Sequence, residues 1–501
     1  MKRNLLIIPA LMVTAFFATT EIAKAADISF SGQILTRYES NENGPNKKNN
    51  FDDGSDAGDF VVSRVRLNTN VAVNDSTSAF IQMSRNGTWG SNSGGVSTGA
   101  NNTGEAVGAT NGSFQVSDSD QNLGVHQAYF TLKNFAGLPA DLKVGRQQII
   151  LDGHRLFGNT IWTVGQQTHD AVRIDHKHDN MSFSAAWIMG SEGGTPGNTD
   201  SGVSLDKDIE TYMAYMKYSG ILGGNLSITY AGIIDPCGTN TATPCTANQD
   251  NDMHTIGARQ AGQLYGIDYR GEYYYQWGDA NQDANALTNG GTAAGLGVDR
   301  DAFMFGLRLG KTFKNVNMKP SLTLWYDYLS GTNDDDLANS GGATWKSFNP
   351  VFDTGHKYYG LQDLFLGVGT GNETNGTAGL GLQDVAIKTK MSPMPGWTFK
   401  ADYHWFFTAE SVRQNRARAG AADPATGRSA ERKGFGASDS SLGNELDLSL
   451  SNKYNANTTI TAGFSNYTTS AAFRDLRNVI GDGANWAYLM FDRSEERRVG
   501  K

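Results

Sequence analysis

Residues 142–175 read LKVGRQQIILDGHRLFGNTIWTVGQQTHDAVRID and predict a strand, an inward loop and a second strand. Polar and apolar residues alternate in 142–150 and again in 169–175, which is the period of a strand with one apolar and one polar face. The loop between the two strands carries His154, Phe157 and Trp162. It is too aromatic for a loop that only lies in solvent, so we expect it to fold inward.

Three arginines in this stretch carry the first functional hypothesis. If the strands close into a barrel, we expect Arg146 and Arg173 to share the polar parity and to point into the lumen. A loop that folds inward would add Arg155, and a cationic constriction would result. The alternative is that these arginines lie at the rim, paired with the neighbouring acids Asp152, Asp170 and Asp175.

Composition favours one long β unit over several soluble domains. The chain has 501 residues with 60 Gly, 11 Pro and 39% hydrophobic residues. Its mean hydropathy of -0.43 is too polar for a set of helical membrane spans. A formal net charge of -9 argues against nucleic acid as a partner.

The N-terminus has the pattern of a secretory signal peptide, predicted over residues 1–25. Met1-Lys2-Arg3 supplies the positive start, an apolar run follows, and Ala23-Lys24-Ala25 is a small-residue cleavage site. An uncleaved membrane anchor is the alternative reading, but the apolar run is short for a span. We therefore expect an exported protein whose barrel occupies residues 26–492.

Amphipathic segments of roughly ten residues recur along the mature chain, as in transmembrane barrels. We count about 18, an even number in the porin range. The predicted strands are 27–39, 59–73, 76–88, 121–134, 138–150, 169–177, 180–190, 208–219, 224–234, 253–260, 263–277, 300–312, 316–330, 381–391, 396–408, 441–453, 457–467 and 484–492.

The length of each connection depends on whether the segment before it is odd- or even-numbered. Gaps after odd-numbered segments are long, whereas gaps after even-numbered ones are tight turns such as Asn74-Asp75 and Lys314-Asn315. A soluble sandwich has no reason to sort its loops this way. An outer-membrane barrel has short periplasmic turns and long extracellular loops. The predicted fold is therefore an all-β transmembrane antiparallel barrel in the outer membrane of a Gram-negative bacterium, with lipid around it.

Further arginines fall on the predicted inner face. Arg64 and Arg66 share their parity with Asn68 and Asn70, while Leu67 lies opposite. Arginine in a water-filled lumen costs little, whereas one facing mid-bilayer lipid costs about 2–4 kcal/mol. Rings of arginine select anions, because a guanidinium offers a carboxylate two parallel hydrogen bonds. Later strands add the candidates Arg259, Arg270, Arg300 and Arg308.

Three motifs resemble the alginate-export family of outer-membrane porins. The first combines Val144-Gly145-Arg146-Gln147, Gly153-His154-Arg155-Leu156-Phe157-Gly158 and Asp170-Ala171-Val172-Arg173. The second is Phe352-Asp353-Thr354-Gly355-His356-Lys357-Tyr358-Tyr359-Gly360, followed by Asp363, and the third is Gly443-Asn444-Glu445-Leu446-Asp447.

The resemblance implies an 18-stranded barrel that conducts an anionic polysaccharide through an arginine-lined constriction gated by loops. Carried over to this sequence, the constriction would contain Arg64, Arg66, Arg146, Arg155 and Arg173. The loop motif would contribute His154, Phe157, His356, Tyr358 and Asp363. Periplasmic export partners are a further expectation, and no cofactor is expected.

The chain ends in an unexpected way. Residues 485–492 alternate as a last strand should, but residues 493–501 read RSEERRVGK and do not close on an aromatic residue. We interpret this tail as a non-native addition. Cys237 and Cys245 share one predicted outer loop, and we expect an oxidising surface to join them in a disulfide.

Catalysis is not expected. No Gly-x-Ser-x-Gly elbow accompanies the histidines, and no histidine pair has an evident third ligand for a metal. Two alternatives to a channel for anionic saccharides stay open. One is a general diffusion porin for small solutes, and the other is a surface receptor or adhesin that acts through its long loops.

Overall fold

The structure is a computed structural model in which ten segments of the chain are described: 27–42, 58–89, 123–191, 209–235, 251–281, 297–333, 344–369, 376–413, 438–477 and 481–499. The predicted signal peptide (1–25) and the pair Cys237 and Cys245 lie outside these residues. Within the described segments, no helix combines the length and the apolar character needed to cross a bilayer.

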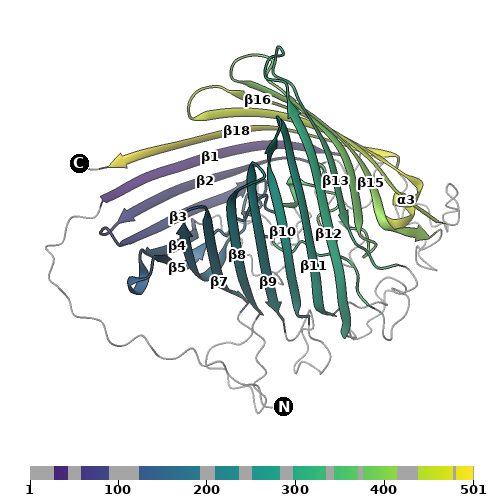
Figure 1. Cartoon of the computed structure of the whole chain (residues 1–501). Helices are drawn as coiled ribbons and strands as arrows, with labels where there is room; N and C mark the ends of the chain where they lie inside the picture. Colours follow the sequence, from purple (N-terminus) through teal and green to yellow (C-terminus); the bar gives the residue numbers. More distant parts are fainter. Residues whose placement is uncertain are drawn as a thin grey trace, which may run out of the picture.

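Eighteen strands form one closed antiparallel barrel, which confirms the predicted fold (Figure 1). Each strand pairs with its neighbours in sequence, and β18 pairs with β1 from Ile28↔Val499 to Asn41↔Trp486 to close the wall. The strands are β1 Asp27–Asn41, β2 Gly58–Ala72, β3 Thr77–Thr88, β4 Gly124–Leu132, β5 Ala140–Gln147, β6 His169–His178, β7 Met181–Ser191, β8 Ile209–Ile221, β9 Gly224–Ile234, β10 Met253–Leu264, β11 Ile267–Asn281, β12 Gly297–Thr312, β13 Ser321–Leu329, β14 Leu382–Met391, β15 Trp397–Arg413, β16 Ser438–Lys453, β17 Thr458–Thr469 and β18 Gly483–Val499.

The connections follow the predicted parity. The turns after even-numbered strands are short, and several hold only two residues, such as Leu222-Gly223 and Tyr265-Gly266. The long connections follow odd-numbered strands, and one of them carries a short helix, α3 (Ala471–Arg477). Short 3-10 turns lie at Phe135–Gly137 and Gly355–Lys357.

Some strand ends differ from those expected. The turn between β10 and β11 lies four residues beyond the expected one. Gly262 falls in the gap between the predicted strands 253–260 and 263–277 but lies within β10, where the Cα of Gly224 approaches so closely that a side chain would collide. β18 continues past the expected end at residue 492, and its pairing with β1 runs on to Val499.

The two faces of the wall differ in polarity. On β2, Leu67 is 47% exposed on the outside, whereas Arg64 is only 1% exposed on the inside. Exposed apolar side chains continue around the outer face, among them Ile174, Ile228, Leu307, Leu324, Ile387 and Phe491. A wall with an apolar outside and a polar inside is suited to lipid around it and water within.

The hydrophobic core lies inside the barrel and not between two sheets. It is built from Phe157 of the β5–β6 connection, Phe352 and Phe365 of the β13–β14 connection, and Phe473 of α3, together with wall residues. Two long loops therefore fold back into the lumen. The inward course expected for the first loop is what the structure has.

Candidate functional site

The two inward loops pack on each other and form one unit, which we call the plug. It consists of residues 148–168, between β5 and β6, and residues 344–369, between β13 and β14. The backbone N–H of Gly158 donates to Phe352 O at 2.7 Å, and that of Thr354 donates to His154 O at 3.1 Å. The rings of Phe157 and Phe352 lie 5.2 Å apart. Because the loops share backbone hydrogen bonds and a core, they have to dock together.

The remaining residues of the predicted loop motif lie where the two loops of the plug pack on each other. His356 stacks on Trp162 with 4.3 Å between ring centroids, and its Nδ1 lies 2.8 Å from Asp363 Oδ1. The Tyr358 hydroxyl donates to the carbonyl of Gly153. The predicted set His154, Phe157, His356, Tyr358 and Asp363 thus joins the two halves of the plug.

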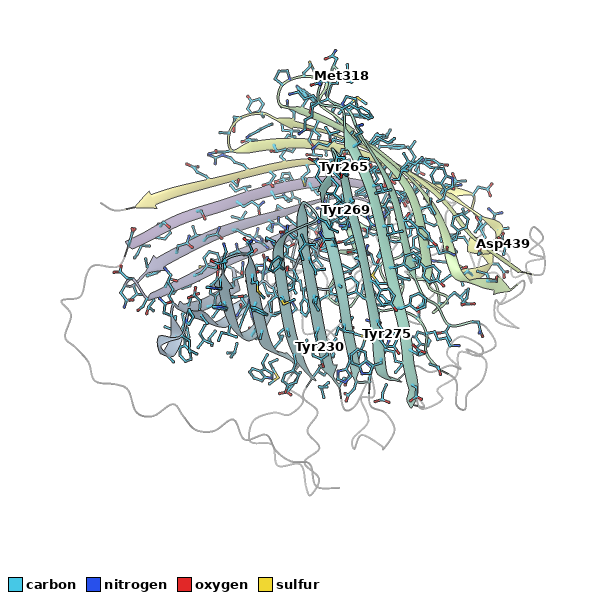
Figure 2. All side chains as sticks on the ribbon, in the orientation of Figure 1. Tyr230, Tyr265, Tyr269, Tyr275, Met318 and Asp439 are labelled. Atoms are coloured by element: carbon cyan, nitrogen blue, oxygen red, sulfur yellow. The ribbon has the colours of Figure 1, made fainter. Side chains whose placement is uncertain are left out.

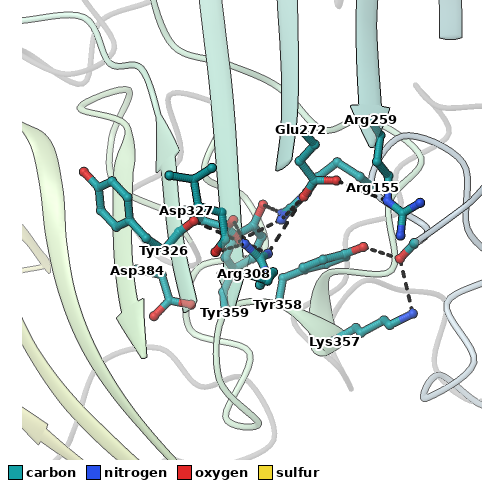
Figure 3. Close-up of polar contacts among 12 residues, drawn as sticks. Arg155, Arg259, Glu272, Arg308, Tyr326, Asp327, Lys357, Tyr358, Tyr359 and Asp384 are labelled. Carbon is teal, nitrogen blue, oxygen red and sulfur yellow. Dashed lines mark hydrogen bonds and ion pairs between the residues drawn. The ribbon is translucent and has the colours of Figure 1, made fainter. Parts of the chain in front are cut away.

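Arg155 fixes the plug to one wall of the barrel (Figure 3). Its guanidinium is almost completely buried, and its Nη2 lies 2.6 Å from Asp327 Oδ2 on β13 and 3.1 Å from Glu272 Oε1 on β11. The same guanidinium lies over the Tyr358 ring at 3.7 Å. A buried cation this well paired is a structural anchor. Arg155 is therefore not available to a solute, contrary to the pore-lining role we expected.

Arginines on the opposite wall hold the other end of the first loop. From β2, Arg64 Nη1 donates to Thr163 O at 3.1 Å, and Arg66 Nη1 donates to Gln166 Oε1 at 2.6 Å. From β1, Arg37 Nη1 donates to Trp162 O at 2.8 Å and lies over the Trp162 ring. Arg64 and Arg66 face the lumen, but they are buried against the loop.

The third sequence motif anchors the second loop. Glu445 and Asp447 project inward from β16, and their carboxylates accept the backbone N–H groups of Gln362 at 2.9 Å and Leu361 at 3.2 Å. Arg477 of α3 donates to the carbonyls of Leu364 and Gly376 on the far side of this loop. All three motifs therefore meet at the plug.

Arg146 does not line the lumen, which corrects our expectation. It shares its strand parity with Leu142 and Val144, and it pairs across to Asp170, on the exposed parity of Val172. Its guanidinium makes two hydrogen bonds to the Asp170 carboxylate, at 2.9 and 2.8 Å. Arg146 thus lies on the outer face near the end of a short strand, in the ion pair that the alternative reading proposed.

Arg173 faces inward and lines a cavity of about 600 Å³ beside the plug. It lies directly opposite Lys143 and forms a 2.7 Å ion pair with Asp175, on its own strand. Lys217 of β8 lines the same cavity and has no polar partner among the described residues. The lining of this cavity is mixed in charge, because Asp141, Asp152 and Asp175 also line it, and Lys217 is a cation in it that no described acid pairs with.

A second cationic group lies where the plug meets β10–β13. Arg270 is directly opposite Arg308 on β12, a like-charge pair of the kind that destabilises a sheet. Both guanidinium groups lie over Trp325, at 5.0 and 3.1 Å from its ring centroid. Arg270 makes no hydrogen bond or ion pair with any described residue, and two of its nitrogens are buried.

Charge is unbalanced at this point. The carboxylates of Asp152, Glu272 and Asp327 lie among five basic side chains, so two positive charges lack a partner. The five are Arg155, Arg259, Arg270, Arg308 and Lys357. Burial lowers the pKa of Lys357, and the three neighbouring arginines Arg270, Arg259 and Arg155 lower it further. We call this group the cation cluster.

The sequence signals for the cation cluster were weak. Arg259, Arg270 and Arg308 stood among the additional candidates, and Lys357 lay in the second family motif without an assigned role. Nothing marked the acids Glu272 and Asp327. Their shared location depends on contacts between strands and a loop far apart in the chain. Among the described residues, no group of three or more His, Cys, Asp or Glu side chains could hold a metal ion.

Comparison with known proteins gives a family and a fold. The sequence profile of a family described as alginate export matches residues 27–482. No curated protein matches the chain in sequence. Among solved structures, OccAB1 of Acinetobacter baumannii is 13% identical, with 94% of this chain and 96% of that chain covered and a TM-score of 0.53. OccAB4 and OccAB3 of the same organism are each 10% identical at a TM-score of 0.50, with 94% of this chain and 98% and 100% of those chains covered.

Proposed function

The chain belongs to the alginate export family and is an outer-membrane channel, and we propose that it passes anionic saccharides, as single sugars or as oligomers, past the cation cluster. The observation that supports this best is Arg270. Its guanidinium faces the lumen opposite Arg308 without an acidic partner among the described residues. A partly buried cation without a counter-charge is costly, so an anionic solute in contact with it would relieve the imbalance.

The proposal assigns anion selectivity to a set of residues that differs from the arginines first expected to supply it. Arg64, Arg66 and Arg155 are bound to the plug or its anchors, and Arg146 lies outside. Solute contact is instead assigned to Arg270, Arg259 and Lys357, with Arg173 and Lys217 on the wall of the larger cavity. A guanidinium provides both a fixed charge and a planar pair of donors for a carboxylate.

The test is reversal potential in planar bilayers under a potassium chloride gradient, followed by block with added sugars. We expect anion preference in the wild type, a weaker preference in Arg270→Gln and an inverted one in Arg270→Glu. A hydrogen bond to a charged group contributes about 1.5–3 kcal/mol. Block by an oligouronate should therefore weaken about 10- to 100-fold in Arg270→Gln.

Controls separate the alternatives. Arg474→Gln removes an ion pair between Arg474 of α3 and the exposed Asp482, and should leave selectivity unchanged. A neutral oligosaccharide of equal length should block weakly. Conductance without anion preference or sugar block would identify a general diffusion porin. A well-folded barrel without conductance would favour a receptor or adhesin.

A further inference from the structure

The periplasmic turns on one side of the barrel carry exposed apolar side chains at their tips. Leu222 is 59% exposed in the turn between β8 and β9, and Tyr265 is 100% exposed in the turn between β10 and β11. Both have a positive φ, 48° and 51°. Asn, Asp and Gly are the residues that favour such positions in hairpins. Two neighbouring turns thus accept a strained backbone together with an exposed apolar side chain.

The next hairpin, between β12 and β13, extends the same surface. Residues 313–320 read FKNVNMKP, and Phe313, Val316 and Met318 are all exposed. Met318 also has a positive φ, of 63°. Figure 2 shows Met318 and Tyr265 at the end of the barrel with the short turns, away from Tyr230 and Tyr275. The outward-facing Leu309 and Leu322 lie just below this hairpin, so the apolar stripe of the outer face continues up to its tip.

Lysines flank these apolar tips. Lys311, Lys314 and Lys319 are exposed, and none of them forms an ion pair with a described residue. Lys311 Nζ lies 5.6 Å from the centroid of the Phe313 ring. Residues 313–320 contain no acidic side chain. The surface is therefore both apolar and cationic.

Two turns on the other side of the barrel are of a different kind. The turn between β2 and β3 holds Asn74, Asp75 and Ser76, and the turn between β6 and β7 holds Asp179 and Asn180. These are the polar residues usual in turns that face water. Other short turns also expose single apolar side chains, such as Leu138 (55%), Met394 (55%) and Tyr454 (70%), but the β12–β13 hairpin combines three of them with the exposed lysines Lys314 and Lys319 in one turn.

We propose that this surface, the tip cluster, binds the anionic headgroups of the phospholipid leaflet that faces the periplasm. The tip cluster comprises Leu222, Tyr265, Lys311, Phe313, Lys314, Val316, Met318 and Lys319. Its apolar side chains enter the boundary between headgroups and acyl chains, and its ammonium groups reach the phosphates. Continuity with the lipid-facing stripe identifies lipid as the occupant, and the unpaired lysines identify an anionic one. The lumen is not involved, so the inference does not depend on the proposed substrate.

Position in the bilayer is the first test. An environment-sensitive fluorophore is attached to Met318→Cys in a Cys237→Ser/Cys245→Ser background, in nanodiscs of phosphatidylcholine with or without phosphatidylglycerol. We expect lipids spin-labelled near the headgroup to quench the fluorophore. The same fluorophore on Asp75→Cys, in the polar turn, should be quenched much less. Equal quenching at the two positions would overturn the proposal.

Charge is the second test. The double variant Lys314→Gln/Lys319→Gln is compared with Lys133→Gln/Lys177→Gln, which removes two exposed lysines on the other side, one in the β4–β5 turn and one near the end of β6. Each lysine near an anionic surface strengthens binding about fivefold. In the variant without Lys314 and Lys319, the phosphatidylglycerol concentration needed for a given rise in unfolding temperature should therefore be roughly 25-fold higher. The control variant should respond as the wild type does. Retained lipid response in Lys314→Gln/Lys319→Gln would refute an electrostatic headgroup site.

Discussion

Arg155→Met should release the plug while leaving the barrel closed. In the wild type, Arg155 meets the buried carboxylates of Asp327 at 2.6 Å and Glu272 at 3.1 Å. Removing one partner of a buried ion pair costs about 3–5 kcal/mol, because the remaining charge stays buried. Arg308 still contacts Asp327 at 2.7 Å and Glu272 at 3.8 Å, which favours the lower end of that range.

A loss of about 3 kcal/mol corresponds to roughly 100-fold in the equilibrium between docked and released plug. The assay is single-channel conductance, in which we expect more frequent openings to a state of larger conductance. The wall itself is held by strand pairing around the whole barrel, so heat-modifiability on gels should remain that of a folded barrel. Arg474→Met removes an ion pair with the exposed Asp482, worth about 0–1 kcal/mol, together with hydrogen bonds to Thr469, and serves as the control. Unaltered conductance and open probability in Arg155→Met would refute the anchoring role of Arg155.

Three further predictions concern the plug and the outer loops. In Gly158→Ala, the new methyl group would collide with Thr354 Oγ1 and its backbone nitrogen, so openings should become more frequent, whereas Gly87→Ala, with open space around it, should behave as the wild type. Burial raises the pKa of Asp353 in the plug from 3.8 to about 8, so the docked plug holds a proton that a released loop would lose. Docking should be strongest below about pH 4 and weaken up to about pH 8, and Asp353→Asn should abolish that dependence of open probability. Cys237 and Cys245 should resist maleimide labelling until a reductant is added, and labelling without reductant would exclude the disulfide.

The fold was predictable because its signals are local. Alternation over ten residues identifies a strand, and the length of each connection identifies the side of the membrane. Strict parity would also have placed Arg146 correctly, with Leu142 and Val144. We grouped it instead with the polar residues of the strand and therefore assigned it to the lumen. The gap predicted at residues 261–262 was misplaced, and Gly262 shows that glycine marks close strand approach as well as turns.

The partners of the predicted arginines could not be read from the sequence. Arg155 is 117 residues from Glu272 and 172 from Asp327, and Arg64 is 99 residues from Thr163. Alternation shows that a side chain points inward, but not whether that side chain is already bound to a loop carbonyl or a carboxylate. That depends on how two loops fold within the lumen, which no strand pattern encodes.

The proposed function separates two uses of positive charge within one lumen. Some arginines have a positioning role: Arg155 of the first family motif holds the plug to β11 and β13, while the wall arginines Arg64 and Arg66 hold its other side. Selectivity requires the reverse property, a cation whose partner is missing until a solute arrives. Arg270 and Lys217 meet that condition among the described residues, and neither lies in a family motif. Substrate preference can therefore change within this fold by substitution at such positions, without disturbing the motif residues that keep the channel plugged.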